Sequence, residues 1–227
     1  MTTPKPPPLF PAFLDLREKP VVVVGGGEVA ERKAKSLLRC GARVTVVAPE
    51  VTDRLAAQAH EGMLAHRVKR FDESDLHGAR MVVAATDDPM VNENVGRAAS
   101  DLGILVNVAD DPALSTFLMG AAVERGPVQV AISTSGTSPA LARRLRARIE
   151  GAVPDGFGTL AALAGRFRAE AIRRLPDPRA RRRFWERVME GPIAALALEG
   201  RETEARDALQ RELNLEADAA AKDGADG

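Results

Sequence analysis

A short run near the amino end of the chain constrains the fold more than any other feature. Four consecutive valines, at residues 21–24, lead directly into Gly25, Gly26 and Gly27, and a helical pattern follows. As strand, turn and helix, the run has the spacing G-x-G-x-x-A that begins a dinucleotide-binding unit. Gly25 permits the tight turn, Gly27 lets backbone approach a pyrophosphate, and Ala30 lets the helix pack closely on the strand. A glycine-rich turn without a ligand is the alternative.

The front part of the chain alternates between strand and helix patterns. We expect strands over residues 21–24, 43–48, 65–70, 81–85 and 104–108, and helices over residues 29–39, 51–61 and 90–102. Strands and helices that alternate at this spacing form parallel sheets covered on both faces. The pattern therefore predicts an α/β fold with a doubly wound, Rossmann-type sheet.

The pattern changes after residues 110–112. Two strands, over residues 117–123 and 128–133, are expected to form a hairpin, and a polar loop then leads into a helix that begins near Pro139. From residue 140 to about residue 215 the periodicity is helical, with breaks at Pro154, at residues 176–178 and at residues 191–192. Residues 217–227 have no apolar face, and we expect them to be disordered.

Composition excludes several classes of protein. The formal net charge is zero, which gives no general attraction to nucleic acid. Cys40 is the only cysteine, so an intrachain disulfide and a cysteine metal cluster are excluded. No stretch approaches the roughly 18 apolar residues of a membrane span, and the proline-rich start has no apolar signal region. We expect a cytoplasmic protein with no nucleic-acid or membrane partner.

Charge is distributed unevenly along the chain. Residues 143–187 contain 13 arginines and only 5 acidic residues, whereas residues 188–227 contain 4 basic and 10 acidic residues. The basic segment is either a set of solvated helix faces or a docking surface for a polyanionic small molecule, because arginine forks pair well with carboxylates.

Candidate cofactor contacts follow the predicted strands, because ligands of open α/β sheets bind beyond the carboxyl ends of the strands. They are Gly25, Gly27, Glu28, Val29, Pro49, Glu50, Thr86 and Asp87. Glu50 comes a little later than the usual ribose-binding acid, so either its carboxylate accepts from the adenosine ribose hydroxyls or the backbone of Pro49 and Glu50 lines the adenine. No arginine directly follows the second strand to bind a 2′-phosphate. We therefore expect NAD rather than NADP. For Asp87 and Asp88 the alternative is a helix N-cap followed by a first-turn proline.

Asp110 is the main candidate for a catalytic group. It closes a buried apolar strand on the cofactor side, where a carboxylate can act as a general base and where partial burial would raise its pKa. The alternative is that residues 110–112 only cap a turn. The three histidines are scattered without ligand spacing, so the sequence identifies no metal site.

Five blocks, in order along the chain, resemble a known family. They are residues 25–33, 84–88, 107–110, 134–139 and 182–186. Together they resemble the precorrin-2 dehydrogenase/sirohydrochlorin ferrochelatase module of siroheme synthase, from about residue 9 to residue 215. The resemblance implies an intertwined homodimer with an NAD-binding Rossmann domain over residues 1–113, a small dimerisation region over 114–150 and an all-helical domain over 151–216, before the tail at 217–227.

The resemblance also implies an activity. NAD accepts a hydride from precorrin-2 to give sirohydrochlorin, and ferrous iron, a second substrate, is then inserted to give siroheme. Asp110 would serve both steps and contact the metal transiently, while Glu28, Val29, Pro49 and Glu50 would contact NAD. A dehydrogenase without chelatase activity and an NAD-sensing regulatory domain are alternatives.

Two departures from the family pattern affect this interpretation. Many relatives fuse the module to a methyltransferase that makes precorrin-2, whereas this chain ends at Gly227, so we expect a separate methyltransferase to supply the substrate. The polar loop has Thr134 and Ser135 where some relatives have Ser-Ser-Gly or Ser-Thr-Gly, which leaves any substrate contact or phosphorylation there unassigned.

Overall fold

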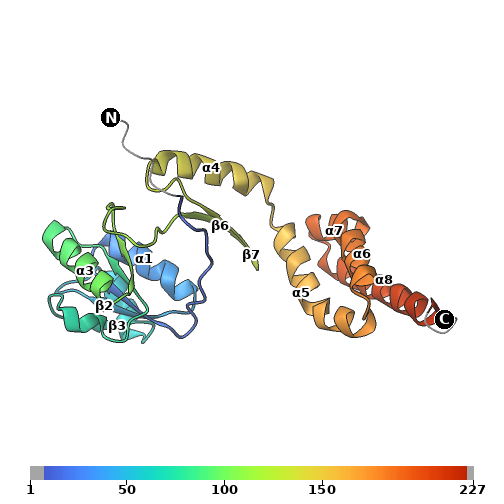
Figure 1. The fold of residues 1–227 in the computed structure, drawn as a ribbon, viewed down its shortest axis with the longest axis horizontal. Helices are drawn as coiled ribbons and strands as arrows, with labels where there is room; N and C mark the ends of the chain where they lie inside the picture. Colours follow the sequence, from blue (N-terminus) through green and yellow to red (C-terminus); the bar gives the residue numbers. More distant parts are fainter. Residues whose placement is uncertain (1–7, 224–227) are drawn as a thin grey trace. The chain divides into compact units, whose positions relative to one another are not determined.

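The computed structural model describes residues 8–223, which divide into two compact units (Figure 1). Unit 1 contains residues 8–119 and 135–137, and unit 2 contains residues 120–134 and 138–223. The first division falls six residues later than the predicted boundary after residue 113. The predicted strand over residues 117–123 also begins later, because Phe117 N donates to Val106 O and Phe117 packs on the core of unit 1.

Unit 1 is built on a parallel sheet of five strands. They are β1 (Pro20–Val24), β2 (Arg43–Val47), β3 (Ala65–Arg67), β4 (Met81–Ala84) and β5 (Leu105–Val108). The order is β3-β2-β1-β4-β5, with Val24 of β1 opposite Val47 on one side and Ala84 on the other. The predicted Rossmann-type fold is therefore confirmed, and its strand order reverses between β1 and β4, where such sheets bind ligands.

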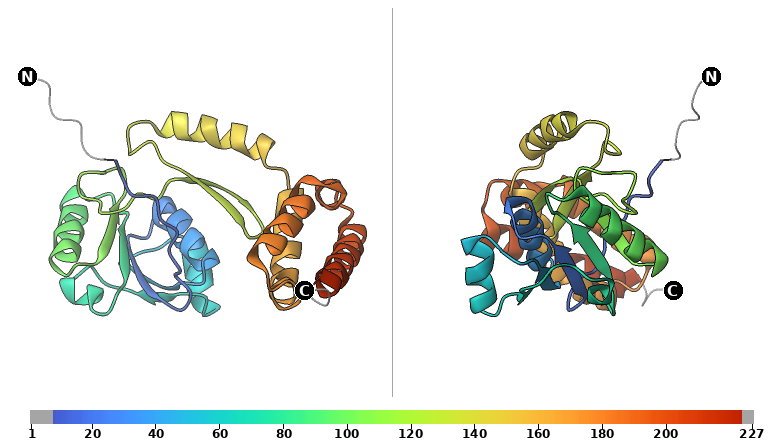
Figure 2. Two further views of the ribbon diagram at one scale, coloured as in Figure 1. Left: turned by 45° about the vertical axis from the view of Figure 1, so that its right-hand side comes forward. Right: turned by 90° about the vertical axis from the view of Figure 1, so that its left-hand side faces the viewer.

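Helices cover both faces of the sheet (Figure 2). They are α1 (Glu28–Arg39), α2 (Asp53–His60) and α3 (Pro89–Asp101), with a short 3₁₀ helix, η1 (Glu73–Leu76), before β4. Alternate valines of β1 enter different cores because successive side chains of a strand point to opposite faces. Val21 and Val23 pack with α1, and Val22 and Val24 pack with α3. Burial on both faces explains the uninterrupted valine run.

Unit 2 contains an antiparallel hairpin and five helices. They are β6 (Ala121–Arg125), β7 (Val128–Ile132), α4 (Pro139–Ala152), α5 (Gly156–Arg174), α6 (Pro178–Glu190), α7 (Pro192–Leu198) and α8 (Glu202–Asp223). The breaks between helices fall where the prolines predicted them. A further break at Gly200, which has a φ of +78°, was not predicted. Phe167, Phe184 and Leu209 are among the buried side chains that join α5–α8.

The expectation of disorder over residues 217–227 is wrong for residues 217–223, which continue α8. Alanine is the strongest helix former, the segment is rich in alanine, and Ala217 also packs against the core that joins α5–α8. Residues 224–227 lie outside the described residues.

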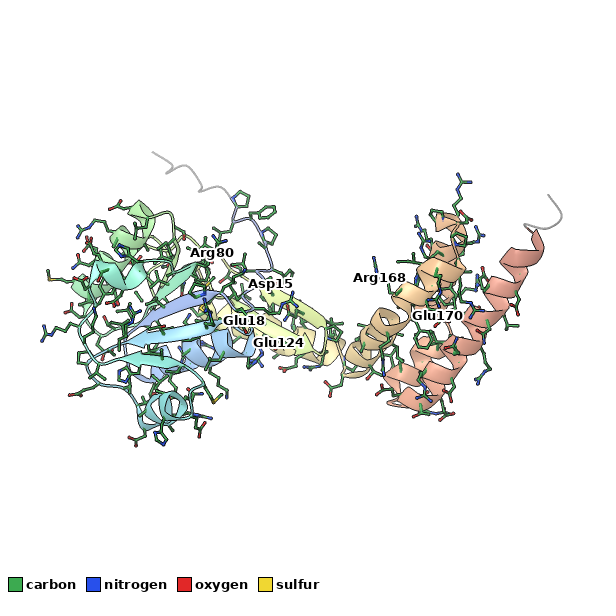
Figure 3. All side chains as sticks on the ribbon, turned by 90° about the horizontal axis from the view of Figure 1, so that it is seen from below. Asp15, Glu18, Arg80, Glu124, Arg168 and Glu170 are labelled. Atoms are coloured by element: carbon green, nitrogen blue, oxygen red, sulfur yellow. The ribbon has the colours of Figure 1, made fainter. Side chains whose placement is uncertain are left out.

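Part of the basic segment pairs with the acidic end of the chain. Arg166 of α5 lies 2.5 Å from Glu202 of α8, and Arg187 of α6 contacts two glutamates of α8. Arg174 pairs with Glu170 one turn before it, whereas Arg168 on the same helix is exposed and has no ion pair within residues 8–223 (Figure 3). The unequal charges of the two sequence segments thus partly offset each other within the helical unit.

Candidate functional site

A cavity of about 990 Å³ lies at the carboxyl edge of the sheet in unit 1. This volume is within the range of cofactor and small-molecule pockets. All eight predicted cofactor residues line it: Gly25, Gly27, Glu28, Val29, Pro49, Glu50, Thr86 and Asp87. Residues from three separate βα turns thus meet around one cavity, and their contact with a cofactor stays a prediction.

The glycine turn shapes this cavity in two ways. Gly25 has a φ of +120°, and a Cβ there would lie 2.2 Å from the carbonyl oxygen of Ala85. A Cβ on Gly26 would lie 1.8 Å from the carbonyl oxygen of Glu50, a requirement that the motif alone did not indicate. A Cβ on Gly27, by contrast, would meet no atom within 4 Å. The first two glycines serve the fold, and the third leaves open space beside the helix.

The amino end of α1 fits an anionic ligand. Gly27 is the N-cap of α1, and no side chain caps the first turn. The first N–H groups of a helix and its dipole attract phosphate. Because Gly27 leaves a space that a Cβ would fill, the residues present fit the pyrophosphate of a dinucleotide.

The end of β2 is fixed against the glycine turn. Thr52 N donates to Gly26 O at 2.9 Å, and the Thr52 hydroxyl caps α2 by accepting from Leu55 N at 3.3 Å. Ala48 N donates to Arg67 O of β3 at 3.3 Å. Backbone hydrogen bonds on both sides therefore hold Pro49 and Glu50 at the cavity.

The end of β4 is organised by Asn92 of α3. The Thr86 hydroxyl donates to Asn92 Oδ1 at 2.9 Å, and Asn92 Nδ2 donates back to Thr86 O at 2.9 Å. Asp88 is the N-cap of α3 and accepts from Met90 N at 2.9 Å, with Pro89 in the first turn. The N-cap interpretation thus holds for Asp88, while Asp87 is exposed and lines the cavity without capping the helix.

Arg70 and Phe71 also line the cavity, and the sequence analysis missed them. It extended the third strand to residue 70, whereas β3 ends at Arg67 and the two residues lie in the following loop. The other candidates were selected because they follow the carboxyl end of a strand. The same rule selects Arg70 and Phe71 once the strand is taken to end at Arg67, because this loop leaves the same edge of the sheet.

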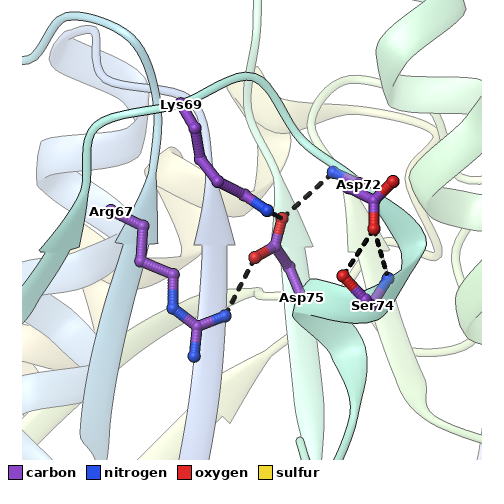
Figure 4. A network of polar contacts seen from close by, with 5 residues as sticks. All are labelled: Arg67, Lys69, Asp72, Ser74 and Asp75. Atoms are coloured by element: carbon purple, nitrogen blue, oxygen red, sulfur yellow. Dashed lines mark hydrogen bonds and ion pairs between the residues drawn. The ribbon is translucent and has the colours of Figure 1, made fainter.

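A buried carboxylate holds this loop (Figure 4). Asp75 of η1 is 4% exposed and accepts from Arg67 Nη1 at 2.9 Å and from Asp72 N at 3.0 Å, with Lys69 Nζ at 3.1 Å. Burial raises the pKa of Asp75, but the hydrogen bonds from Asp72 N, Lys69 and Arg67 outweigh it and hold the pKa below its ordinary value. The ionised carboxylate thereby fixes the residues on both sides of Arg70.

Asp110 differs from its prediction in one respect. It is exposed, not partly buried, because the chain turns outward after β5 with a φ of +60° at this residue. The turn is capped by Asp111, which accepts from Ala113 N at 2.9 Å and Leu114 N at 3.1 Å. The Asp110 side chain makes no hydrogen bond within the described part of the chain, so the turn-capping alternative applies to Asp111. Asp110 does not line the cavity.

Lys33 is a further polar residue that the sequence analysis did not select. Its Nζ donates to Oδ1 of the buried Asn107 at 3.3 Å, and Asn107 Nδ2 donates to Phe117 O at 3.1 Å. Burial lowers the pKa of Lys33 and Arg32 lowers it further, whereas the carboxylate of Asp110 opposes this. Two of the sequence blocks, residues 25–33 and 107–110, thus meet in space through Lys33.

The described residues contain neither a candidate metal site nor a helix suited to cross a membrane. Within residues 8–223, no group of three or more His, Cys, Asp or Glu side chains is placed to hold a metal ion. In the same residues, none of the helices combines the length and the apolar character that a membrane crossing requires.

Three family models match the chain in succession. An NAD(P)-binding model matches residues 12–121, a model of the sirohaem biosynthesis protein central region matches residues 125–152, and the sirohaem synthase dimerisation region matches residues 156–213. The match to the third model, whose name refers to dimerisation, covers α5–α7 and the first part of α8. The sequence analysis expected the dimerisation region over residues 114–150, most of which match the central-region model, and the bounds of the dimerisation region stay a prediction.

Similar proteins carry consistent names. The siroheme synthase of Nitrosospira multiformis is 48% identical over 211 residues, which are 91% of this chain and 45% of the relative. That of Methylococcus capsulatus is 50% identical over 213 residues, which are 94% of this chain and 44% of the relative. The chain spans less than half the length of these relatives.

A solved structure titled "SirC, precorrin-2 dehydrogenase" has a TM-score of 0.71 and 27% identity, and the match covers 89% of this chain and 100% of that one. The order of the three family models agrees with the order of parts in the fold. The chain therefore belongs to the family of the precorrin-2 dehydrogenase/sirohydrochlorin ferrochelatase module of siroheme synthase.

Proposed function

We propose that this chain catalyses the NAD-dependent oxidation of precorrin-2 to sirohydrochlorin. One observation carries the proposal: an open dinucleotide-sized cavity lies where the strand order reverses, in a chain that matches the whole of a structure titled precorrin-2 dehydrogenase. When bound, NAD supplies the acceptor for the hydride that leaves the substrate.

The residues around the cavity divide the binding of NAD between them. The turn at Gly27, with Glu28 and Val29, would hold the pyrophosphate at the start of α1. Pro49 and Glu50 would contact the adenosine ribose, and the loop at Thr86 and Asp87 would lie beside the nicotinamide half, because it follows the strand beyond the switch point.

Asp110 is the proposed proton acceptor. Loss of a hydride from carbon leaves a proton to be removed, and a carboxylate is a suitable general base. Asp110 follows β5, one strand beyond β4, and its side chain is exposed and free of capping bonds. The left-handed backbone at this residue is tolerated by aspartate and asparagine better than by most residues.

We further propose that the same carboxylate serves the insertion of ferrous iron, which is a substrate of that step. Insertion requires protons to leave two pyrrole nitrogens, and the Asp110 carboxylate, which accepts no hydrogen bond within the described residues, is suited to accept them one after the other. The names of the curated relatives support this step, and a dehydrogenase that leaves iron insertion to another protein is the alternative.

The experiment uses the purified chain under anaerobic conditions. With precorrin-2 and NAD, we expect NADH and sirohydrochlorin to form together, and no turnover would refute the dehydrogenase proposal. NAD binding without tetrapyrrole binding would favour the regulatory alternative. With preformed sirohydrochlorin, ferrous iron and no NAD, we expect the siroheme spectrum, and its absence would leave the dehydrogenase alone.

Two asparagine variants test the assignment of Asp110. Asp110→Asn should abolish proton transfer while tolerating the left-handed backbone. Asp111→Asn is the matched control, because its amide oxygen can still accept from Ala113 N and Leu114 N. Loss of activity in the Asp111 variant alone would reverse the assignment.

We also propose that the chain forms a homodimer, which the match of residues 156–213 to a dimerisation region supports. Sedimentation of the purified chain at twice the monomer mass would agree with this proposal, and a monomer at micromolar concentration would contradict it. A separate methyltransferase and a cytoplasmic location stay predictions.

A further inference from the structure

We propose that Glu50 and Arg70 form an opposed pair at the adenosine end of the cavity, in which Glu50 makes the protein select NAD and Arg70 would bind the 2′-phosphate of NADP once Glu50 is neutralised. The inference rests on the proposed function only in requiring that the cavity binds a dinucleotide. It assigns a specificity role to Arg70, which lies outside the glycine motif.

The register of β2 and β3 places Glu50 and Arg70 at corresponding positions beyond the carboxyl ends of two neighbouring strands. β2 and β3 are parallel neighbours, with Val47 opposite Arg67. Glu50 and Arg70 each follow this pair by three residues, and both residues line the cavity. In dinucleotide-binding folds, the ribose of the adenosine is recognised just past the second strand.

Glu50 is the member that disfavours an added phosphate. Its backbone is fixed by close packing of its carbonyl oxygen on Gly26 and by the hydrogen bond from Thr52 N to Gly26 O. A carboxylate held there can accept from ribose hydroxyls, whereas a 2′-phosphate would bring two like charges together.

Arg70 is the member that would attract the phosphate. Among the residues that line the cavity, it is the one arginine or lysine, and the acidic residues of the lining are Glu28, Glu50, Asp87 and Asp88. Its side chain has no hydrogen bond or ion pair within residues 8–223, and a guanidinium can pair with phosphate through two parallel hydrogen bonds.

The loop presents Arg70 in a fixed position. Arg67 and Lys69 both contact the buried Asp75, and Phe71 packs against the core formed on the α3 face of the sheet. The anchoring contacts therefore lie on both sides of Arg70 and leave its own guanidinium available. An arginine held in this way loses less conformational entropy on binding than one in a free loop.

The test measures dissociation constants for NAD and for NADP by calorimetry on the full chain. The variants are Glu50→Gln, Arg70→Gln and the double variant. Arg43→Gln is the charge-matched control, because Arg43 is exposed at the opposite, amino end of β2. Glu50 and Arg70 are also exposed, and a thermal unfolding curve for each variant verifies that the fold is retained.

We expect the wild-type chain to bind NAD at least about tenfold more tightly than NADP. Glu50→Gln should shift the ratio of the two constants toward NADP by about tenfold or more, and adding Arg70→Gln should remove most of that shift. Arg43→Gln should leave the ratio unchanged.

Two results would overturn this inference but leave the proposed function intact. In the first, NAD binds but Glu50→Gln leaves the ratio of the NAD and NADP dissociation constants unchanged. In the second, the double variant keeps the full gain in NADP affinity. If the wild-type chain binds NADP as tightly as NAD, the selectivity assigned to Glu50 is also wrong. If neither dinucleotide binds the wild-type chain, the proposed function fails and this inference fails with it.

Discussion

A methyl group added at Gly26 would collide with the backbone of Glu50. Its Cβ would lie 1.8 Å from the Glu50 carbonyl oxygen, whereas ordinary contacts begin at 3.4 Å, so the two segments must separate by about 1.6 Å. That movement would break the hydrogen bond from Thr52 N to Gly26 O. Overpacking costs about 1–3 kcal/mol and the lost hydrogen bond about 1 kcal/mol, so we expect Gly26→Ala to destabilise the chain by about 3 kcal/mol.

Gly27→Ala is the matched variant. Its Cβ would meet no atom within 4 Å, and the φ of −81° suits alanine, so the stability should fall by less than about 1 kcal/mol, the difference between glycine and alanine as N-caps. The methyl group would instead occupy the space assigned to the pyrophosphate. We expect Gly27→Ala to fold normally and to lose NAD binding by at least about tenfold.

Thermal unfolding by circular dichroism and calorimetric titration with NAD separate the two effects. For a chain of this size, 1 kcal/mol shifts the Tm by about 2–4 °C, so Gly26→Ala should lower it by about 6–12 °C. An unchanged Tm for Gly26→Ala would refute the steric argument. NAD binding at wild-type strength by Gly27→Ala would refute the placement of the pyrophosphate.

Three further predictions concern stability. Asp75→Asn should lower the free energy of unfolding by about 2 kcal/mol at neutral pH, because Arg67, Lys69 and Asp72 N lose the carboxylate that they contact. The loss is limited because the two cations remain hydrated. The folded pKa of Asp75 is below its ordinary 3.8, so this advantage of the wild type is present above that value and should vanish in urea titrations as the pH falls through the folded pKa. Phe184→Ala should lower the free energy of unfolding by about 3–5 kcal/mol in the same titrations, because its ring is fully buried. Met189→Ala on the same helix, where the side chain is 41% exposed, should cost far less, and equal losses would contradict the assigned core. Arg187→Gln should cost at most about 1 kcal/mol at low salt and nothing at high salt, because its ion pairs with α8 are partly exposed; a loss that persists in high salt would show another role.

Local patterns in the sequence predicted most of the fold. The valine run, the glycine turn and the prolines at residues 154, 178 and 192 each act on the few residues beside them, so strands, helices and helix breaks could be located from the chain alone. The eight cofactor candidates also followed from local order, because each comes directly after a strand, and parallel strands end at one edge of the sheet.

Some boundaries were not predictable from these patterns. The third strand ends at Arg67, and Arg67 and Lys69 contact Asp75 of η1. Because the apolar pattern does not show this end of the strand, Arg70 was counted as part of the strand, and neither Arg70 nor Phe71 was selected as a cavity residue. The last helix extends to Asp223 because a helix already packed at Leu209 and Ala217 gains one hydrogen bond for each residue that it adds.

The sequence by itself determined the strand and helix segments and the residue types at the ends of the strands. Only the tertiary structure decided that Gly26 must lack a side chain, that Lys33 meets Asn107 and that Asp110 is exposed. The first two depend on residues that are distant in the chain and become neighbours only when the sheet forms, and the third depends on the outward turn that follows β5. Periodicity records which side of an element is apolar, but not which atom of another segment will lie against it.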